Sequence, residues 1–136
     1  MSFVLDASVT LAWFFEDEQT DATQALLQRL RDEDAVVPSI WMYEVCNQLA
    51  RAMAKGRVDA DQISVIVGTL GDLAIELASP APIPMIHAAV RHGLTAYDVA
   101  YLEIADARGI PLATLDKRLR TAAAKAGVGV LPEALD

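Results

Sequence analysis

Cysteine and positive charge are both scarce in this sequence of 136 residues. The single cysteine, Cys46, excludes a disulfide within the chain, which fits a reducing compartment. Acidic residues number 19 against 11 lysines and arginines, which gives a formal net charge of −8. Taken alone, that charge argues against a nucleic-acid-binding protein with a broad basic face.

Long apolar runs are also missing. No segment reaches about 18 uninterrupted apolar residues, so we expect no membrane span. Residues 1–6 lack the basic start and long apolar stretch of a signal peptide, and the cytoplasm is the expected location. Hydrophobic residues make up 54% of the chain and charged residues 22%, as in globular proteins, and the length suits a single domain over residues 1–136.

Several common site motifs are absent. There is no glycine-rich phosphate loop and no dinucleotide-binding fingerprint. His87 and His92 are five residues apart, which does not place both on one helical face, and no zinc site is expected with one cysteine. Asp6 has no second aspartate two residues on, as a phosphatase would use, and no adjacent acid, as a phospho-acceptor domain would need.

Short apolar runs alternate with segments of helical spacing along nearly the whole chain. The expected strands cover residues 2–5, 35–37, 73–77, 110–115 and 128–131. The expected helices cover residues 7–15, 21–31, 38–55, 59–70, 85–91, 95–108 and 117–126, and the prolines at 80, 82 and 84 are interpreted as a stiff connection. This alternation predicts a parallel sheet with helices on both faces.

Four carboxylates stand at places where such a fold can bring them together. Asp6 and Asp116 each end a predicted strand, whereas Glu44 and Asp98 lie early in predicted helices. Open parallel sheets bind ligands outside the carboxyl ends of their strands. Carboxylates gathered there repel one another unless a cation joins them, most simply a hard divalent metal held by oxygen ligands.

Each acid also has a purely structural interpretation. Asp6 and Asp116 can cap the helices that follow them. Residues 95–98 match a capping box, in which Asp98 reaches back to the helix start. Glu44 can be an ordinary exposed helix residue, although its neighbours are apolar enough to be buried, and a buried carboxylate usually has a partner. The joint placement of all four favours a site.

Small polar residues accompany these acids. Ser8 follows Asp6 by two residues, Thr114 precedes Asp116 by two, and Asn47 follows Glu44 by three. Such groups orient a carboxylate or hold a metal-bound water, or else they bond to the local backbone.

Basic residues form two groups. The first, at residues 51–57, closes a predicted helix, where cations are favoured by the helix dipole. The second, at residues 117–120, opens a helix, where cations are unfavourable. Lys117 and Arg118 are therefore candidates for phosphate contacts.

Four segments together resemble the PIN-domain ribonucleases, and within them the VapC-type toxins of toxin–antitoxin pairs. They lie in the family's order and cover residues 4–8, residues 38–39 with 44–47, residues 94–102 and residues 109–119. The resemblance implies a three-layer α/β/α sandwich with a central parallel sheet of four to five strands.

The resemblance also implies an activity and partners. The expected protein is an endoribonuclease that uses Mg²⁺ or Mn²⁺ to hydrolyse RNA, is usually a homodimer, and is inhibited by a small VapB-like antitoxin. Carried over by position, Asp6, Glu44, Asp98 and Asp116 form its catalytic and metal-binding site. The alternatives are a non-catalytic PIN-fold module that binds RNA or protein, and a related nuclease for DNA or branched structures.

Two apolar groups are candidates for partner contacts. Trp13, Phe14 and Phe15 are consecutive, and one helix face cannot bury all three, so we expect at least one of them at the surface or against another chain. This favours a groove for an apolar antitoxin segment. The apolar set at residues 63–67 is a second candidate for core or interface.

Overall fold

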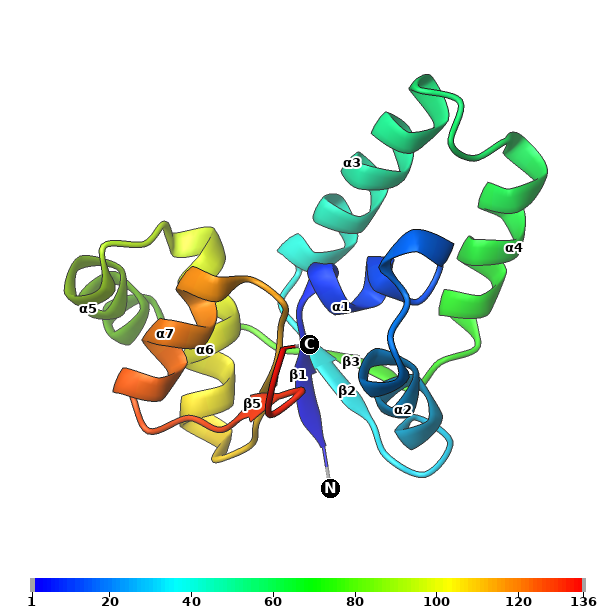
Figure 1. Cartoon of the computed structure of the whole chain (residues 1–136). Helices are drawn as coiled ribbons and strands as arrows, with labels where there is room; N and C mark the ends of the chain where they lie inside the picture. Colours follow the sequence, from blue (N-terminus) through cyan, green and yellow to red (C-terminus); the bar gives the residue numbers. More distant parts are fainter. Residues whose placement is uncertain (1, 136) are drawn as a thin grey trace.

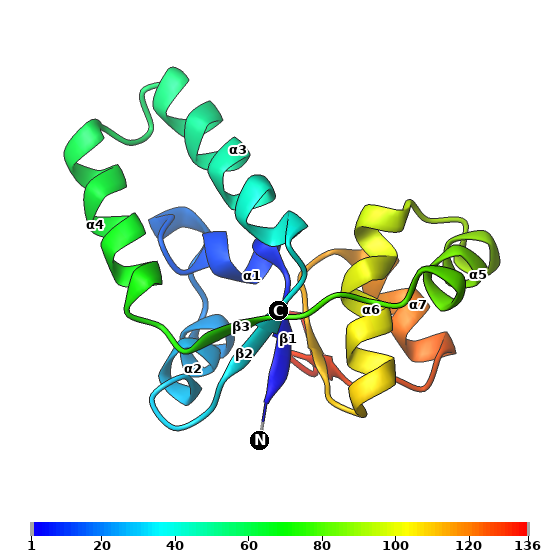
Figure 2. The same ribbon diagram turned by 180° about the vertical axis from the view of Figure 1, so that it is seen from behind.

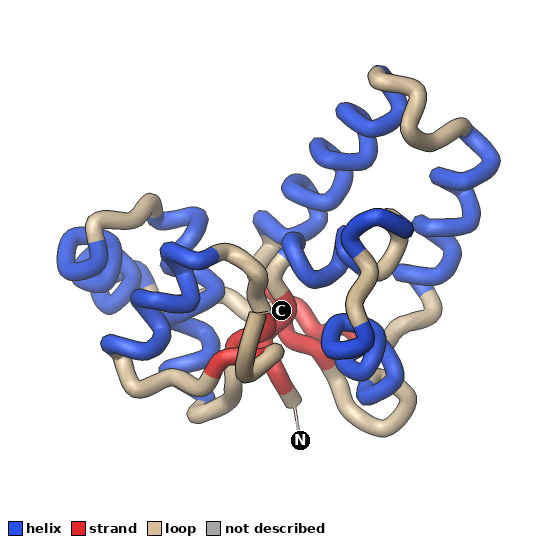
Figure 3. The backbone as a smooth tube through the Cα atoms, in the orientation of Figure 1, coloured by secondary structure: helices blue, strands red, loops and turns tan. Residues whose placement is uncertain are grey.

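Five parallel strands form a single sheet at the centre of the computed structural model, which describes residues 2–135 (Figures 1 and 3). The strands are β1 (Phe3–Leu5), β2 (Ala35–Val37), β3 (Ile75–Leu77), β4 (Leu112–Ala113) and β5 (Val130–Leu131). Their order across the sheet is β3-β2-β1-β4-β5, so the first strand in sequence is the middle strand in space. The residue that follows β1 therefore emerges at the centre of the carboxyl edge.

Helices cover the sheet on both sides. They are α1 (Ala7–Ala12), the 3₁₀ helix η1 (Glu16–Glu18), α2 (Asp21–Arg29), α3 (Ile40–Ala54), α4 (Ala60–Gly71), α5 (Pro82–His92), α6 (Ala96–Arg108) and α7 (Lys117–Lys125). Helices α1 to α4 lie on one side and α5 to α7 on the other, and α3 and α4 extend beyond the sheet as a helical hairpin (Figures 1 and 2). The predicted three-layer α/β/α architecture is confirmed.

The three inner strands carry the core. Every residue of β1, β2 and β4 is apolar and buried, as expected for parallel strands covered on both faces. The edge strand β3 is different, because Glu76 and Leu77 are exposed. No helix within residues 2–135 has both the length and the apolar character needed to cross a bilayer.

Helix ends follow local signals in the sequence. Asp59 precedes α4 and its side chain accepts a hydrogen bond from the backbone N–H of Gln62, in a capping box. Gly93 and Gly109 end α5 and α6 with φ of +62° and +64°, a left-handed conformation that glycine adopts without a steric penalty. The predicted ends of these two helices are confirmed to within a residue.

Several predicted element boundaries are wrong, among them the start of α5 and both ends of β4. Helix α5 begins at Pro82 rather than at residue 85, because prolines are tolerated in a first helical turn, where the backbone N–H has no helical acceptor. The strand expected over 110–115 is shorter, with only Leu112–Ala113 in the sheet.

The prediction that at least one of the aromatic residues 13–15 lies at the surface or against another chain holds only for Phe14, which is partly exposed. Helix α1 ends at Ala12, so the three aromatic side chains do not have to share one helix face. Trp13 and Phe15 are 3% and 7% exposed, and Phe14 packs against the core. The indole N–H of Trp13 donates to the backbone oxygen of Thr23 at 2.7 Å.

Candidate active site

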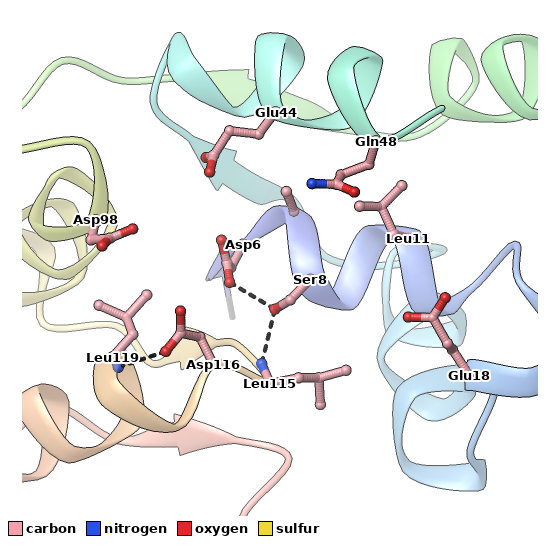
Figure 4. Close-up of a pocket in the computed structure, with 11 residues that line it drawn as sticks. Asp6, Ser8, Leu11, Glu18, Glu44, Gln48, Asp98, Leu115, Asp116 and Leu119 are labelled. Carbon is pink, nitrogen blue, oxygen red and sulfur yellow. Dashed lines mark hydrogen bonds between the residues drawn. The ribbon is translucent and has the colours of Figure 1, made fainter. Parts of the chain in front are cut away.

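A pocket of about 390 Å³ opens at the carboxyl edge of the sheet, and five acidic residues line it (Figure 4). The lining residues are Asp6, Ala7, Ser8, Leu11, Glu18, Glu44, Gln48, Asp98, Leu115, Asp116 and Leu119. All four carboxylates singled out from the sequence are among them. No lysine or arginine of the described residues lines this pocket, so the chain itself supplies no countercharge there.

Asp6 is the buried centre of the pocket. It follows β1, is 7% exposed, and its Oδ2 accepts hydrogen bonds of 2.7 Å from both Ser8 Oγ and Thr114 Oγ1. Burial raises the pKa of Asp6 above its usual value and the negative charge of Asp116 adds to this, while the Thr114 and Ser8 hydrogen bonds oppose it. Its side chain makes no cap hydrogen bond to α1, so the helix-capping interpretation does not hold for this acid.

Two hydroxyl groups connect Asp6 to the loop between β4 and α7. Ser8 Oγ accepts from the backbone N–H of Leu115 at 2.9 Å, and Thr114 Oγ1 accepts from the N–H of Asp116 at 3.1 Å. Each hydroxyl therefore donates to the carboxylate and accepts from the backbone. The two roles that the sequence left open for Ser8 and Thr114, orienting an acid and bonding to the backbone, are both present.

Glu44 reaches the pocket from α3. It is half-buried, and its Oε1 accepts a 2.5 Å hydrogen bond from the hydroxyl of Tyr101 on α6. Burial raises the pKa of Glu44, the Tyr101 bond lowers it, and the charges of Asp6 and Asp98 raise it further. Burial and the Glu44 carboxylate raise the pKa of Tyr101 far above its usual range, so this hydroxyl stays a donor.

Asp98 and Asp116 border the pocket from the ends of two helices. The backbone N–H of Asp98 donates to Thr95 Oγ1 at 3.2 Å, but the described residues show no return bond from the Asp98 carboxylate, which points toward Asp6 (Figure 4). Asp116 does cap its helix, since its Oδ1 accepts from the N–H groups of Arg118 and Leu119 at 2.9 and 3.2 Å. The capping interpretation thus holds for Asp116, which lines the pocket as well.

The supporting positions predicted on α3 and α7 lie elsewhere. Asn47 is exposed and does not line the pocket, whereas Gln48, four residues after Glu44, does. Lys117 and Arg118 do not line it either, and the guanidinium of Arg118 donates to the backbone oxygen of Gly93 at 3.1 Å. Residues three and four positions after Glu44 can both share its helix face, and here the residue at the fourth position, Gln48, lines the pocket.

Glu18 and Tyr101 also belong to the site, and the sequence did not single them out. Glu18 belongs to η1, which the fold brings to the pocket rim, and no local pattern indicates that position. Tyr101 had a weak signal, because it follows Asp98 by three residues and so shares its helix face.

The donor chemistry of the pocket fits a hard divalent cation. Its acidic groups are all carboxylates, and their mutual repulsion contributes to the raised pKa of Asp6 and of Glu44. Within residues 2–135, no three Asp, Glu, His or Cys side chains form a ready-made metal cage. Mg²⁺ does not need one, because it retains several waters and is commonly bound by one or two carboxylates together with substrate phosphates.

A parallel α/β sheet with an acidic pocket at its carboxyl edge defines the class of protein. The family model of the PIN domain matches residues 3–125, and the chain therefore belongs to the PIN domain family. This confirms the resemblance inferred from the four sequence segments.

Individual relatives agree with that assignment. The chain is 28% identical over 123 residues to the protein named Ribonuclease VapC3 of Pyrobaculum aerophilum, covering 88% of this chain and 92% of the relative. The crystal structure of PAE2754 from Pyrobaculum aerophilum superposes with a TM-score of 0.66 at 21% identity, over 90% of this chain and 84% of that one. FitAcB from Neisseria gonorrhoeae gives 0.64 at 19% identity, over 98% of both chains. These two structures share the fold.

Proposed function

We propose that the protein is a metal-dependent endoribonuclease that hydrolyses RNA phosphodiester bonds and acts as the toxin of a type II toxin–antitoxin pair. One observation carries the proposal: Asp6 is buried, held by two hydroxyl groups, and shares with Glu44, Asp98 and Asp116 a pocket that no lysine or arginine within residues 2–135 lines. Membership of the PIN domain family and the similarity to Ribonuclease VapC3 support the ribonuclease activity.

The four acids have distinct proposed roles. Asp6 and Asp98 are the direct or water-mediated metal ligands, and Glu44 and Asp116 complete the set. When bound, Mg²⁺ or Mn²⁺ stabilises negative charge on the phosphate and on the leaving oxygen and activates a water. No side-chain nucleophile is required.

The chain's own contribution is to hold these carboxylates in place before the substrate arrives. Ser8 and Thr114 fix one oxygen of Asp6, and Tyr101 fixes Oε1 of Glu44. Glu44 lines the pocket, and its other oxygen is assigned the role of orienting the attacking water. Such preorganisation is effective because the groups do not have to rearrange during the reaction.

The partners follow from the VapC-type similarity. We propose a small VapB-like antitoxin that neutralises the enzyme and a homodimer as the active assembly. The sequence of the RNA target is not encoded in the acidic pocket, because every RNA presents the same phosphates, and selection depends on exposed bases and shape.

The first experiment is a cleavage assay with purified, antitoxin-free protein on total RNA, transfer RNA and, as a separate substrate, DNA. Mg²⁺ or Mn²⁺ is compared with EDTA, and Asp98→Asn with the wild type. Asp106→Asn is the matched control, because Asp106 is an exposed acid on the same helix and does not line the pocket. We expect metal-dependent cutting by the wild type and by Asp106→Asn, and no cutting by Asp98→Asn.

Other outcomes distinguish the alternatives. Equal cutting by Asp98→Asn contradicts the assignment of the acidic pocket as the active site. Cutting of DNA but not RNA identifies a related DNA nuclease. Folded, metal-binding protein that cuts neither identifies a non-catalytic binding module.

A further inference from the structure

A second pocket of about 240 Å³ adjoins the acidic one. It is lined by Leu11, Phe15, Glu18, Gln48, Arg51, Ala52, Lys55 and Arg57. Three of these residues, Leu11, Glu18 and Gln48, also line the acidic pocket, so the two pockets are neighbours on the same side of the molecule. Figure 4 shows the three shared residues on the side of the acidic pocket that lies away from Asp98.

The two pockets have opposite charge. Three of the chain's 11 basic residues, Arg51, Lys55 and Arg57, line the second pocket, whereas the acidic pocket has none among the described residues. The chain has a net charge of −8, so this group of cations beside the acids forms a positively charged patch on a mostly negative protein.

One face of α3 connects the two pockets. Glu44, Gln48, Arg51 and Lys55 are spaced by four, three and four residues, which places them along a single stripe of the helix. At about 1.5 Å per residue, Arg51 lies roughly 10 Å along the helix axis from Glu44. The stripe begins at the acidic pocket and ends in the basic one.

Arg57 forms a fixed wall of the second pocket. Its guanidinium lies 4.3 Å from the centre of the Phe15 ring, and its Nη2 is 2.8 Å from Asp17 Oδ1 and 3.6 Å from Glu18 Oε2. These contacts position the side chain but offset much of its charge.

Arg51 and Lys55 supply the remaining positive charge. Both are exposed, and none of the ion pairs found within residues 2–135 involves either of them. The helix dipole explains why cations are tolerated near the end of α3, but it does not explain why both border a pocket that adjoins the acidic one.

We infer that the basic pocket binds a backbone phosphate of the RNA strand next to the phosphate that is cut. The inference rests on the proposed ribonuclease function. An RNA strand whose scissile phosphate lies among the acids extends out of that pocket, and the shared wall of Leu11, Glu18 and Gln48 leads it to Arg51 and Lys55. The position of the basic pocket beside the acidic one favours RNA over an acidic protein segment, because only a strand with regularly spaced phosphates has a reason to reach both pockets.

A third pocket provides the matched control. It is basic as well, with Arg118 and Lys125 in its lining, but it shares no lining residue with the acidic pocket. Neutralising Lys125 removes the same charge as neutralising Lys55, at a place that the inferred RNA path does not touch.

The test measures RNA binding and cleavage separately. Binding of a single-stranded RNA is measured by fluorescence anisotropy over a range of salt concentrations, in the Asp98→Asn background to prevent cutting. Lys55→Gln is compared with Lys125→Gln, which removes the same single charge, and the double variant Arg51→Gln/Lys55→Gln is compared with both. Circular dichroism checks the fold of each. We expect the double variant to bind on the order of tenfold more weakly, as removal of charge-assisted hydrogen bonds predicts, and Lys125→Gln to bind normally.

Two further readouts follow from the same interaction. The slope of log affinity against log salt becomes shallower by roughly 0.7 for each phosphate of a single strand that the protein no longer neutralises. In the active protein, the double variant raises KM and leaves kcat nearly unchanged, because the phosphate is bound equally in the ground state and in the transition state.

Each contrary result has a separate meaning. Unchanged affinity and salt slope in the double variant overturn the inference and leave the proposed nuclease standing. Weaker binding of a polyglutamate peptide with unchanged binding of RNA assigns the pocket to an acidic protein partner instead. RNA binding by none of the proteins, together with no cleavage by the wild type, overturns both the inference and the proposed function.

Discussion

Asp6 and Asp116 occupy equivalent places in the sequence and different places in the structure. Each directly follows an apolar strand run and precedes a helix, and either can cap that helix. In the fold, Asp116 is exposed and does cap α7, whereas Asp6 is buried and makes no cap hydrogen bond. Their strands, β4 and β1, are neighbours in the sheet.

The difference arises from where each strand lies and from what surrounds its end. Because β1 is the middle strand, the end of β1 is enclosed by α1, by the β4–α7 loop and by helices from both layers. The Asp6 carboxylate accepts its hydrogen bonds from Ser8 and Thr114 instead of from the first backbone N–H groups of α1. Two acids with the same local pattern therefore have different surroundings: Asp6 is held inside the pocket by two hydroxyl groups, and Asp116 is shared between the pocket and a helix cap.

The largest expected effect is on catalysis, and it separates the two acids. Asp6→Asn should lower the rate of RNA cleavage by about a thousandfold or more, because it removes a buried charge that the metal requires. Asp116→Asn should cost less, because asparagine caps helices about as well as aspartate. Single-turnover cleavage in excess Mg²⁺ measures both rates.

The comparison fails if the two variants lose equal activity while both remain folded. It also fails if Asp116→Asn is the more damaged of the two. Thermal unfolding of each variant shows whether lost activity reflects lost structure.

The next effect is stabilisation by metal. The proposed metal site exists in the folded protein and not among the dispersed carboxylates of the unfolded chain. Mg²⁺ should therefore raise the free energy of unfolding by about 2.7 kcal/mol at a hundredfold excess over Kd. Asp6→Asn should abolish most of this gain, and Asp116→Asn should retain part of it. Thermal denaturation in Mg²⁺ and in EDTA measures the gain, with Asp106→Asn as a control that should behave as the wild type.

A feature of the fold or of the acidic pocket could be predicted from the sequence when it depends only on residues that are neighbours in the chain. The buried strands, the alternation with helices and the ends at Gly93 and Gly109 follow from local patterns, and their order placed Asp6 at the edge of the sheet. Four of the five acids of the pocket were found in this way, and Glu18 was not. The capping pattern could not distinguish Asp6 from Asp116, because burial is set by strands far away in sequence.

The features that local patterns did not predict have a common cause in tertiary packing. Gln48, and not Asn47, faces the pocket because the rotation of α3 is fixed by its buried residues Trp41, Val45 and Leu49. Glu18 reaches the pocket only because the chain turns after α1 and buries Trp13. Neither fact is contained in a window of neighbouring residues.

A smaller effect is expected from the residue that touches both acids. Thr114 is fully buried; its hydroxyl donates to Asp6 and accepts from the N–H of Asp116. Thr114→Val keeps the shape but leaves that N–H without its acceptor, which should destabilise the protein by about 1–3 kcal/mol. Urea denaturation measures the loss.

Thr114→Ser is the matched control, because it retains the hydroxyl and removes only a methyl group. It should keep both hydrogen bonds and the metal response. If serine and valine are equally damaging, packing rather than hydrogen bonding explains the role of Thr114.

The smallest expected effect is a pH dependence of stability in the absence of metal. Burial raises the pKa of Asp6 in the folded state, so between the ordinary value and the raised one the folded protein binds more protons than the unfolded chain. Stability from this group is therefore lost as the pH rises through that interval. Glu33 acts in the opposite direction, because Arg29 holds its pKa at about 2 and its contribution is lost as the pH falls.

The difference between wild type and Asp6→Asn isolates the Asp6 contribution from that of Glu33. Urea denaturation in EDTA, from about pH 4 to about pH 8, should show the wild type losing stability relative to Asp6→Asn as the pH rises. Asp116→Asn should also lessen that loss, because the negative charge of Asp116 contributes to the raised pKa of Asp6. Adding Mg²⁺ should reverse the trend, since metal and protons compete for the same carboxylate. A pH-independent difference would mean that Asp6 is as well solvated as Asp116, and the contrast between the two strand ends would then have no electrostatic basis.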